Sequence, residues 1–392
     1  MKLSNCTRFA ARAAELLEPH LIRLTAAGCL LFSAAISPAF ASPADDTGGQ
    51  ILPNPVITAS TVPSIGDVNP YGVAFVPPGY PAGFVKPGDI FVSNYNNAQN
   101  LQGTGRTIVR FDSHGKQSLF FEGRPGIGLS TALNVSKEGP IFVGNSPTTD
   151  GTFATAQPGS IFVLSPTGHL LQTLADTRYI DAPWDSTLYE NNGKGKLFIS
   201  NALSGTVARL DLEIGYNSVK VLSAHIVASG YVHRGDPATL FVAPTGLVYD
   251  AALDTLYVAS AGDNAVFAVP YAGTATQDIG PGRIIYEDHV HLHGALAMTA
   301  APNGHLLVTN SDGINSDPNQ PSEIVEFTKD GKFVAELPVD PNQGGSFGLA
   351  FGVPLADSSV RFAAVDDVTN TLTIWTLNYD DPDSNAKMVK AY

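Results

Sequence analysis

Three histidines occupy alternate positions in the segment His289-Val-His-Leu-His293. If this segment is extended, its alternate side chains point to the same side, and neutral imidazoles are common ligands of zinc and copper. A single histidine could instead act as a general base, or one or two could simply cap the entry into the following strand. We name His291 and His293 as the candidate metal ligands. The segment lacks the four regularly spaced ligands of recognisable structural zinc sites.

A second polar cluster, Tyr231-Val-His-Arg-Gly-Asp236, brings an imidazole, a guanidinium and a carboxylate together in the sequence. Arg234 could hold a ligand carboxylate through a bidentate pair of hydrogen bonds, or it could pair only with Asp236. Trp184 could stack on a sugar or aromatic ligand, or it could cover a channel as a hydrophobic lid. The candidate ligand-binding residues are Asn69, Tyr71, Trp184, Asp185, His233 and Arg234.

Two further motifs match known chemistry only in part. Asn310–Asp317 is rich in oxygen ligands suited to calcium, but it lacks the spacing and the terminal Glu of an EF-hand, and Asx turns explain it equally well. Gly344-Gly-Ser-Phe-Gly348 matches Gly-x-Ser-x-Gly, but a nucleophile elbow needs a strand before the serine and a helix after it. Zinc and calcium are therefore candidate cofactors, and the sequence establishes neither.

Short strands must position these residues. Charged residues make up only 15% of the 392, whereas there are 38 Gly and 28 Pro, a composition typical of many short strands joined by turns. An apolar run that ends in a small polar residue recurs about every 50 to 60 residues, a period that suits four-stranded propeller blades. The copies are Ile90–Asn94, Ile141–Asn145, Leu197–Asn201, Leu256–Ser260, Leu306–Asn310 and the degenerate Phe362–Asp366.

An inner strand is predicted before each copy. These strands are Gly72–Val76, Thr131–Val135, Ser186–Tyr189, Gly246–Tyr249, Ala295–Thr299 and Gly348–Phe351. The last repeat, which ends with Thr371–Leu377, lacks a fourth strand, while an unpaired strand lies around Pro55–Val62. Pairing the two would remove two open sheet edges. The sequence thus predicts an all-β fold, a six-bladed β-propeller with four-stranded blades whose ring is closed by an N-terminal strand.

Propeller topology places the loops between blades and the loops between strands two and three on one face. His, Asp and Asn are concentrated in those loops, and propeller ligands usually bind where such loops surround the central channel. We therefore expect binding at that face. The Asn, Ser or Asp that ends each second strand is expected to be structural, because a short polar side chain there can bond the turning backbone.

Three strings resemble exported, NHL-repeat-type six-bladed propeller proteins over about residues 50–378: Asn69-Pro-Tyr-Gly-Val-Ala-Phe75, Asp254-Thr-Leu-Tyr-Val-Ala-Ser260 and Phe347-Gly-Leu-Ala-Phe351. The segments Leu101–Gly105, Ala228–Tyr231 and His291–Gly294 are similar to one bacterial subgroup of that family. The resemblance implies fold and export but no activity. Gluconolactonase-type propellers hold a metal at positions that match Asn69, Asp185 and His293 approximately, but their first acidic ligand has no counterpart here.

The first 41 residues read as a cleaved signal peptide, with a basic start, an apolar run Leu24–Phe40 and a cleavage site after Ala41. A lipoprotein signal ending at Cys29 is the weaker alternative. Residues 42–50 are expected to be a flexible linker, 51–378 the propeller and 379–392 a tail. Cys6 and Cys29 both lie in the signal, so the mature chain would have no disulfide.

The formal net charge of −14, without basic clusters, argues against nucleic acid or anionic lipid as a partner. We expect a secreted or periplasmic monomer without a membrane span. Two functions remain open from the sequence. One is a non-catalytic propeller that binds a small ligand, a glycan or an envelope protein through the loops around its channel. The other is a metal-dependent, lactonase-like hydrolase or lyase with a His/Asp site at the channel mouth.

Overall fold

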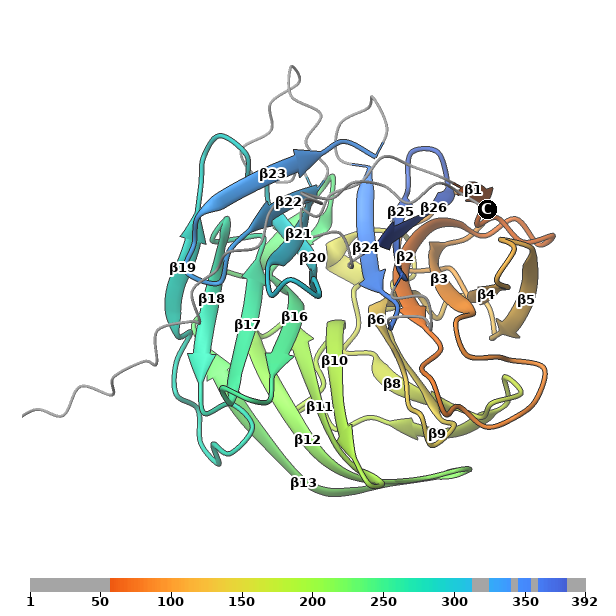
Figure 1. Cartoon of the computed structure of the whole chain (residues 1–392), viewed down its shortest axis with the longest axis horizontal. Helices are drawn as coiled ribbons and strands as arrows, with labels where there is room; N and C mark the ends of the chain where they lie inside the picture. Colours follow the sequence, from red (N-terminus) through yellow and green to blue (C-terminus); the bar gives the residue numbers. More distant parts are fainter. Residues whose placement is uncertain (1–56, 312–323, 340–344, 354–358, 379–392) are drawn as a thin grey trace, which may run out of the picture. The chain divides into compact units, whose positions relative to one another are not determined.

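The computed structural model describes residues 57–311, 324–339, 345–353 and 359–378. They form six four-stranded antiparallel sheets arranged as the blades of a propeller around a central channel (Figure 1). The predicted all-β, six-bladed fold is confirmed. The expected signal peptide (1–41), linker (42–50), C-terminal tail (379–392) and most of the calcium-like segment lie outside the described residues.

Each blade runs from an innermost to an outermost strand in chain order. Blade 1 consists of β2 (Val68–Phe75), β3 (Ile90–Asn96), β4 (Thr107–Phe111) and β5 (Gln117–Glu122). Blade 2 consists of β6 (Leu129–Val135), β7 (Ile141–Asn145), β8 (Ser160–Leu164) and β9 (Leu170–Leu174). Blade 3 consists of β10 (Pro183–Asn191), β11 (Lys194–Asn201), β12 (Thr206–Gly215) and β13 (Ser218–Ser229). Blades 4 and 5 are β16 (Pro244–Asp250), β17 (Thr255–Ser260), β18 (Ala265–Pro270), β19 (Arg283–Glu287); and β20 (Ala295–Ala300), β21 (Leu306–Asn310), β22 (Ile324–Phe327), β23 (Phe333–Leu337).

The sixth blade contains both ends of the described chain. It consists of β24 (Ser346–Phe351), β25 (Ser359–Asp366), β26 (Thr371–Asn378) and, as its outer strand, β1 (Ile57–Ser60). β1 pairs antiparallel with β26 in the register Ile57↔Ile374 to Ser60↔Thr371. The predicted closure by an N-terminal strand is therefore confirmed, and the ring is held at that point by an antiparallel ladder between distant parts of the chain.

Five of the six inner strands begin two to four residues before the predicted start. All six contain a register irregularity near their first residues. In blade 1, for example, the pairing shifts between Pro70 and Val73, and the equivalent shift occurs in every other blade. Such a bulge turns the side chains that precede it to a new direction. The first residues of each inner strand therefore lie at one end of the channel, beyond the bulge.

Glycine at the bulge allows neighbouring inner strands to come into backbone contact. A Cβ on Gly348 of β24 would lie 2.0 Å from the Tyr71 carbonyl oxygen of β2, and one on Gly246 of β16 would lie 2.4 Å from the Met298 nitrogen of β20. Side chains at these positions would collide with backbone atoms, which cannot move without moving a whole blade. The channel is narrowest at this layer.

The polar residue that ends the second strand bonds the backbone in most blades, as predicted, whereas the Asn145 amide donates to the Ser160 side chain. The Oδ1 of Asn201 accepts the Asp181 N–H at 2.9 Å, and the Oδ1 of Asn310 accepts the His293 N–H at 2.9 Å. The Oδ1 of Asp366 likewise accepts the N–H groups of the turn that follows β25. These side chains hold the turns at one face of the ring, and that role accounts for their recurrence.

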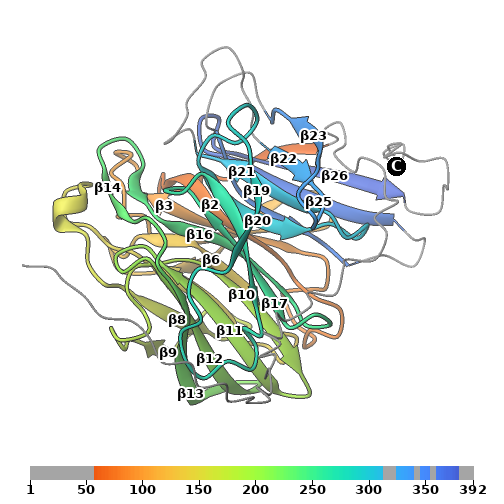
Figure 2. The ribbon, with the colours of Figure 1, turned by 90° about the vertical axis from the view of Figure 1, so that its left-hand side faces the viewer.

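Among the residues that the structure describes, no helix is both long and apolar enough to cross a membrane. A single 3₁₀ turn, η1 (Phe153–Thr155), is the helical element of the described ranges. A two-stranded hairpin, β14 (Arg234–Asp236) with β15 (Leu240–Val242), lies between blades 3 and 4 in the chain and was not predicted. Figure 2 shows β14 and η1 side by side at one edge of the ring.

Candidate functional site: the central channel

Aromatic side chains close the channel at the face where the sequence predicted ligand binding. The Tyr71 ring stacks on Tyr95 and on Phe347, with centroid distances of 4.6 and 4.2 Å. Trp184 meets Tyr95 edge-on at 5.3 Å and Phe241 at 4.9 Å. All five rings are buried, and they come from blades 1, 3 and 6 and from the unpredicted hairpin. We call these five residues the aromatic plug.

The hairpin β14–β15 contributes to the plug from outside the blades. Leu240 and Phe241 of β15 are buried in the same apolar cluster as Tyr71 and Trp184. Phe153 of η1 covers Phe241 edge-on at 5.7 Å, and Gly235 allows this ring to approach the hairpin backbone. The hairpin therefore seals one end of the channel.

Two of the predicted ligand-binding residues, Tyr71 and Trp184, belong to the plug, and Trp184 takes the alternative role of a lid. Burial raises the pKa of the Tyr71 hydroxyl well above its ordinary value, so it stays protonated. Asn69 is also buried; its backbone has a φ of 61° and donates to the Asn370 side chain at 2.7 Å. These three residues pack against the protein itself.

His233 and Arg234 lie at the exposed turn before and at the start of β14. A guanidinium nitrogen of Arg234 is 3.1 Å from an Asp236 carboxylate oxygen, which corresponds to the purely structural alternative. His233 Nδ1 lies 3.0 Å from the Tyr231 carbonyl oxygen. Neither side chain reaches the channel lining. Their binding role stays a prediction.

The histidine segment is not extended, so its side chains do not share a side. His289 to His291 form a turn, and His289 is exposed. His291 Nδ1 lies 2.6 Å from Asp288, and its ring stacks on Phe333 of the outer strand β23 at a centroid distance of 3.9 Å. His293 is buried at the start of blade 5. The expectation that His291 and His293 point to the same side is wrong, because the turn directs His291 toward the outer strand.

Within the described ranges, no group of three or more His, Cys, Asp or Glu side chains is close enough together to hold a metal ion. Burial would raise the pKa of Asp288, but hydrogen bonds from His291 and from backbone N–H groups lower it to about 2, and His291, one of the two candidate ligands, is hydrogen-bonded to this carboxylate. Metal binding by His291 and His293 stays an untested prediction. Ser346 of the Gly-x-Ser-x-Gly match is fully buried at the start of β24.

The opposite end of the channel is open. A cavity of about 360 Å³ is lined by residues from all six inner strands, among them Phe75, Leu188, Tyr249 and Phe351 near the strand ends. Along every inner strand except the first, exposure increases from the plugged end toward this mouth. Cavities of this size are typical of small-molecule sites. The cavity is therefore the candidate functional site.

Asp185, one of the predicted site residues, lies at the narrow inner end of this cavity. It occupies the position that Gly72, Gly246 and Gly348 occupy in other blades. Burial raises its pKa to about 8, although backbone N–H groups of Ser186 and Leu247 donate to the carboxyl group, the first at 2.7 Å. At neutral pH the group therefore carries a proton, and its hydroxyl can donate a hydrogen bond.

Thr131 of blade 2 is a further polar residue of the cavity that the sequence analysis did not single out. The irregular stretch of β6 is one residue longer than in the other blades, and Thr131 lies within it. Its side chain is 6% exposed, and its hydroxyl has no hydrogen-bond partner among the described residues. The residue type was the signal that could have revealed it. Most other blades have Gly or Ala at this point of the inner strand, whereas blade 2 has Thr131. Thr131 and Asp185 are two of the polar residues that line this cavity, together with apolar residues such as Leu247 and Met298.

No protein-family profile and no curated protein matches the chain. Among solved structures, it is similar to a protein of unknown function from Bacteroides caccae, with 13% identity, a TM-score of 0.42, and coverage of 69% of this chain and 81% of that one. It is also similar to a putative oxidoreductase (glucose dehydrogenase) from Thermus thermophilus, with 11% identity, a TM-score of 0.47, and coverage of 81% and 99%. At these identities the likeness concerns the fold alone.

Asp185 should make the stability of the protein fall as the pH rises from about 4 to about 8. Between its ordinary pKa of 3.8 and the folded value of about 8, the folded protein holds a proton that the unfolded chain has lost. Raising the pH through this window therefore favours unfolding, with a slope of up to about 1.4 kcal/mol per pH unit. Urea unfolding of wild type and Asp185→Asn at pH 5, 6, 7 and 8 isolates this contribution. Parallel pH profiles would show that Asp185 is ionised in the fold.

Proposed function

We propose that the protein is a non-catalytic binding protein that takes a small uncharged ligand into its central channel, through the mouth opposite the aromatic plug. The observation that carries this proposal is the Thr131 hydroxyl, which is buried, faces the cavity and has no partner among the described residues. An unbonded buried hydroxyl costs free energy. A ligand that bonds to it would recover that cost.

The lining favours a compact amphiphilic ligand, such as an amide or an alcohol. Thr131 can donate or accept, and protonated Asp185, across the boundary between blades 2 and 3, can do the same. Apolar side chains such as Leu247, Met298 and Leu349 form part of the walls between these polar groups and can contact a short hydrocarbon part of the ligand. A charged ligand would lose its hydration without an opposite charge to compensate, which disfavours it.

The enclosed cavity supports a small ligand over a glycan or an envelope protein, which would need a broad exposed surface. The alternative of a metal-dependent, lactonase-like hydrolase or lyase has no specific observation in its favour. The resemblance to exported NHL-repeat-type propellers and the signal-like residues 1–41 support a place in the periplasm or outside the cell. We include that location in the proposal.

Paired threonine variants test the proposal. The experiment screens wild type by thermal shift at pH 6.5 against small amides, alcohols and monosaccharides, with charged analogues beside them, and then measures affinities by calorimetry. In Thr131→Val, the protein should keep or gain stability, because an unbonded buried hydroxyl is removed, while affinity falls at least about tenfold. This result would show that the Thr131 hydroxyl contributes to ligand affinity and not to the stability of the fold.

Thr245→Val is the matched control. The Thr245 hydroxyl is equally buried, but it donates to the carbonyl oxygens of Ala295 and Ala259 at 2.9 and 3.2 Å. This variant should lose about 1–3 kcal/mol of stability and keep its affinity. An Ala350→Trp variant at the open mouth should abolish uptake. Unchanged affinity in Thr131→Val, or binding that survives Ala350→Trp, would contradict the proposal.

A further inference from the structure

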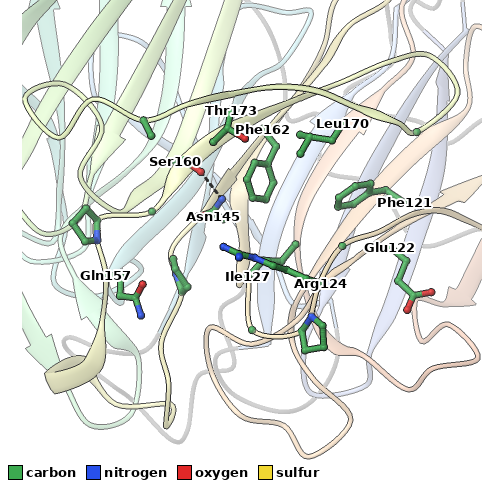
Figure 3. Close-up of a pocket in the computed structure, with 18 of the residues that line it drawn as sticks. Phe121, Glu122, Arg124, Ile127, Asn145, Gln157, Ser160, Phe162, Leu170 and Thr173 are labelled. Atoms are coloured by element: carbon green, nitrogen blue, oxygen red, sulfur yellow. Dashed lines mark hydrogen bonds between the residues drawn. The ribbon is translucent and has the colours of Figure 1, made fainter.

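A second and larger cavity lies away from the channel, between blades 1 and 2. Its volume is about 1050 Å³, and it is bounded by the end of β5, the loop from Gly123 to Ile127, and the strands β8 and β9 (Figure 3). It shares no lining residue with the channel cavity. Any ligand it takes is therefore bound independently of the proposed channel ligand.

The walls of this cavity are partly aromatic. Phe121 and Ile127 are buried in the apolar cluster between blades 1 and 2, and Phe162 packs against that cluster. Figure 3 shows Phe162 facing into the cavity from β8, with Phe121 and Leu170 at its side. Leu170 is 52% exposed on the outer strand β9. These side chains offer an apolar surface for a planar or aliphatic body.

Arg124 is the charged group of the cavity, and it differs from every other described arginine. It has no ion pair or hydrogen bond among the described residues, whereas the other arginines all do. They are Arg106 with Glu122, Arg110 with Asp89, Arg178 with Asp176, Arg209 with Asp211, Arg234 with Asp236, Arg283 with the Ile284 carbonyl and Arg361 with the Gly88 carbonyl. What distinguishes Arg124 is therefore that neither a carboxylate nor a carbonyl of the described residues holds its guanidinium.

The one carboxylate in the lining does not neutralise Arg124. Glu122 lies 3.1 Å from Arg106, and Figure 3 shows its side chain directed away from the cavity centre, whereas Arg124 extends inward toward Asn145. The side-chain N–H of Asn145 donates to the Ser160 hydroxyl oxygen at 2.8 Å. The guanidinium fork of Arg124 is thus available to an incoming anion.

We propose that this cavity binds an organic carboxylate, with the carboxylate on Arg124 and the apolar body against Phe121, Phe162 and Leu170. A guanidinium matches the planar geometry of a carboxylate through two parallel hydrogen bonds. Because Arg124 is exposed, the ion pair alone is weak, and the apolar body must supply most of the affinity. A small or multiply charged anion would gain little from this site and would be repelled by the acidic surface.

Calorimetry with 1-naphthoate, its neutral counterpart 1-naphthamide, benzoate, decanoate, acetate and inorganic phosphate tests the assignment. We expect naphthoate to bind about two- to fivefold more tightly than naphthamide, and acetate and phosphate not to compete with it. In Arg124→Gln, naphthoate should fall to the affinity of naphthamide, so that the preference for the acid disappears. In Phe162→Ala, both compounds should weaken together.

Arg283→Gln is the matched control, because it removes an exposed arginine of β19 in blade 4 that does not line the cavity. It should leave the naphthoate affinity unchanged, as should Thr131→Val in the channel. The proposal is overturned if none of the three larger acids binds, if the preference for naphthoate persists in Arg124→Gln, or if phosphate competes as well as naphthoate does.

Discussion

Replacing Gly348 with alanine should destabilise the fold by about 3 kcal/mol or more. The new Cβ would lie 2.0 Å from the Tyr71 carbonyl oxygen and 3.0 Å from the Val73 nitrogen, both backbone atoms of the neighbouring blade. Relief requires blades 6 and 1 to move apart, and overpacking that the backbone cannot absorb costs this much. The midpoint of urea unfolding measures the loss.

Gly83→Ala is the control for this variant. Gly83 has no atom within 4 Å of its potential Cβ and does not need a left-handed backbone, so its replacement should change stability by no more than about 0.5 kcal/mol. Similar midpoints for the two variants would show that blades 6 and 1 do not meet backbone to backbone. Such a result would remove the narrow layer on which the channel geometry depends.

Replacing Trp184 with alanine should cost about 3–5 kcal/mol, because it leaves a void at the centre of the aromatic plug. The indole is 1% exposed and contacts the rings of Tyr71, Tyr95 and Phe241. These rings come from different elements, so the neighbours cannot collapse together without moving β2 or the β14–β15 hairpin. Urea unfolding again measures the effect.

Trp184→Phe separates the ring from its N–H group. The indole nitrogen has no hydrogen-bond partner among the described residues, so phenylalanine should retain most of the packing and lose less than about 1.5 kcal/mol. An equal loss in the two variants would mean that the indole has a specific polar role that its surroundings do not show. A small loss in both would mean that the plug is loosely packed.

The two ends of the channel have opposite characters, and this asymmetry directs the functional argument. The face that carries most of the His, Asp and Asn loops is closed by the plug and the hairpin. The opposite face, joined by ordinary turns, leads into the cavity that holds Asp185 and Thr131. The polar side chains of these loops bond the backbone at the closed face. The proposed ligand site lies at the opposite face.

The architecture could be predicted from the amino-acid pattern alone. Apolar runs that end in a small polar residue recur with the period of a four-stranded blade, because each blade must bury the same two faces against its neighbours. The predicted runs Ile141–Asn145 and Leu306–Asn310 coincide with the observed β7 and β21. Closure by the N-terminal strand also followed, because an unpaired strand and a missing strand must meet if no sheet edge is to stay open.

Five of the six inner strands were predicted to begin too late, since only Ala295–Ala300 begins where it was expected, and three of the five have a clear physical reason. Pro70, Pro183 and Pro244 stand at their starts, and the bulge that follows breaks the alternation of apolar and polar residues. A proline near a strand start suggests a breaker, although it is tolerated at a bulge or at the first position. The residues that face the channel lie in this stretch. The alternation of apolar and polar residues therefore gave little information about the residues that line the candidate site.

The geometry of the site depends on contacts between blades. Asp185 was named from the sequence, but its pKa is raised by burial in the assembled ring, which outweighs the opposing effect of the N–H groups of Ser186 and Leu247. The hydroxyl of Thr131 faces the cavity because β6 carries one extra residue in its bulge, a shift that single-strand patterns do not reveal. Which side chains meet across a ring depends on contacts between segments that are about 50 residues or more apart, and local periodicity contains no information about those contacts.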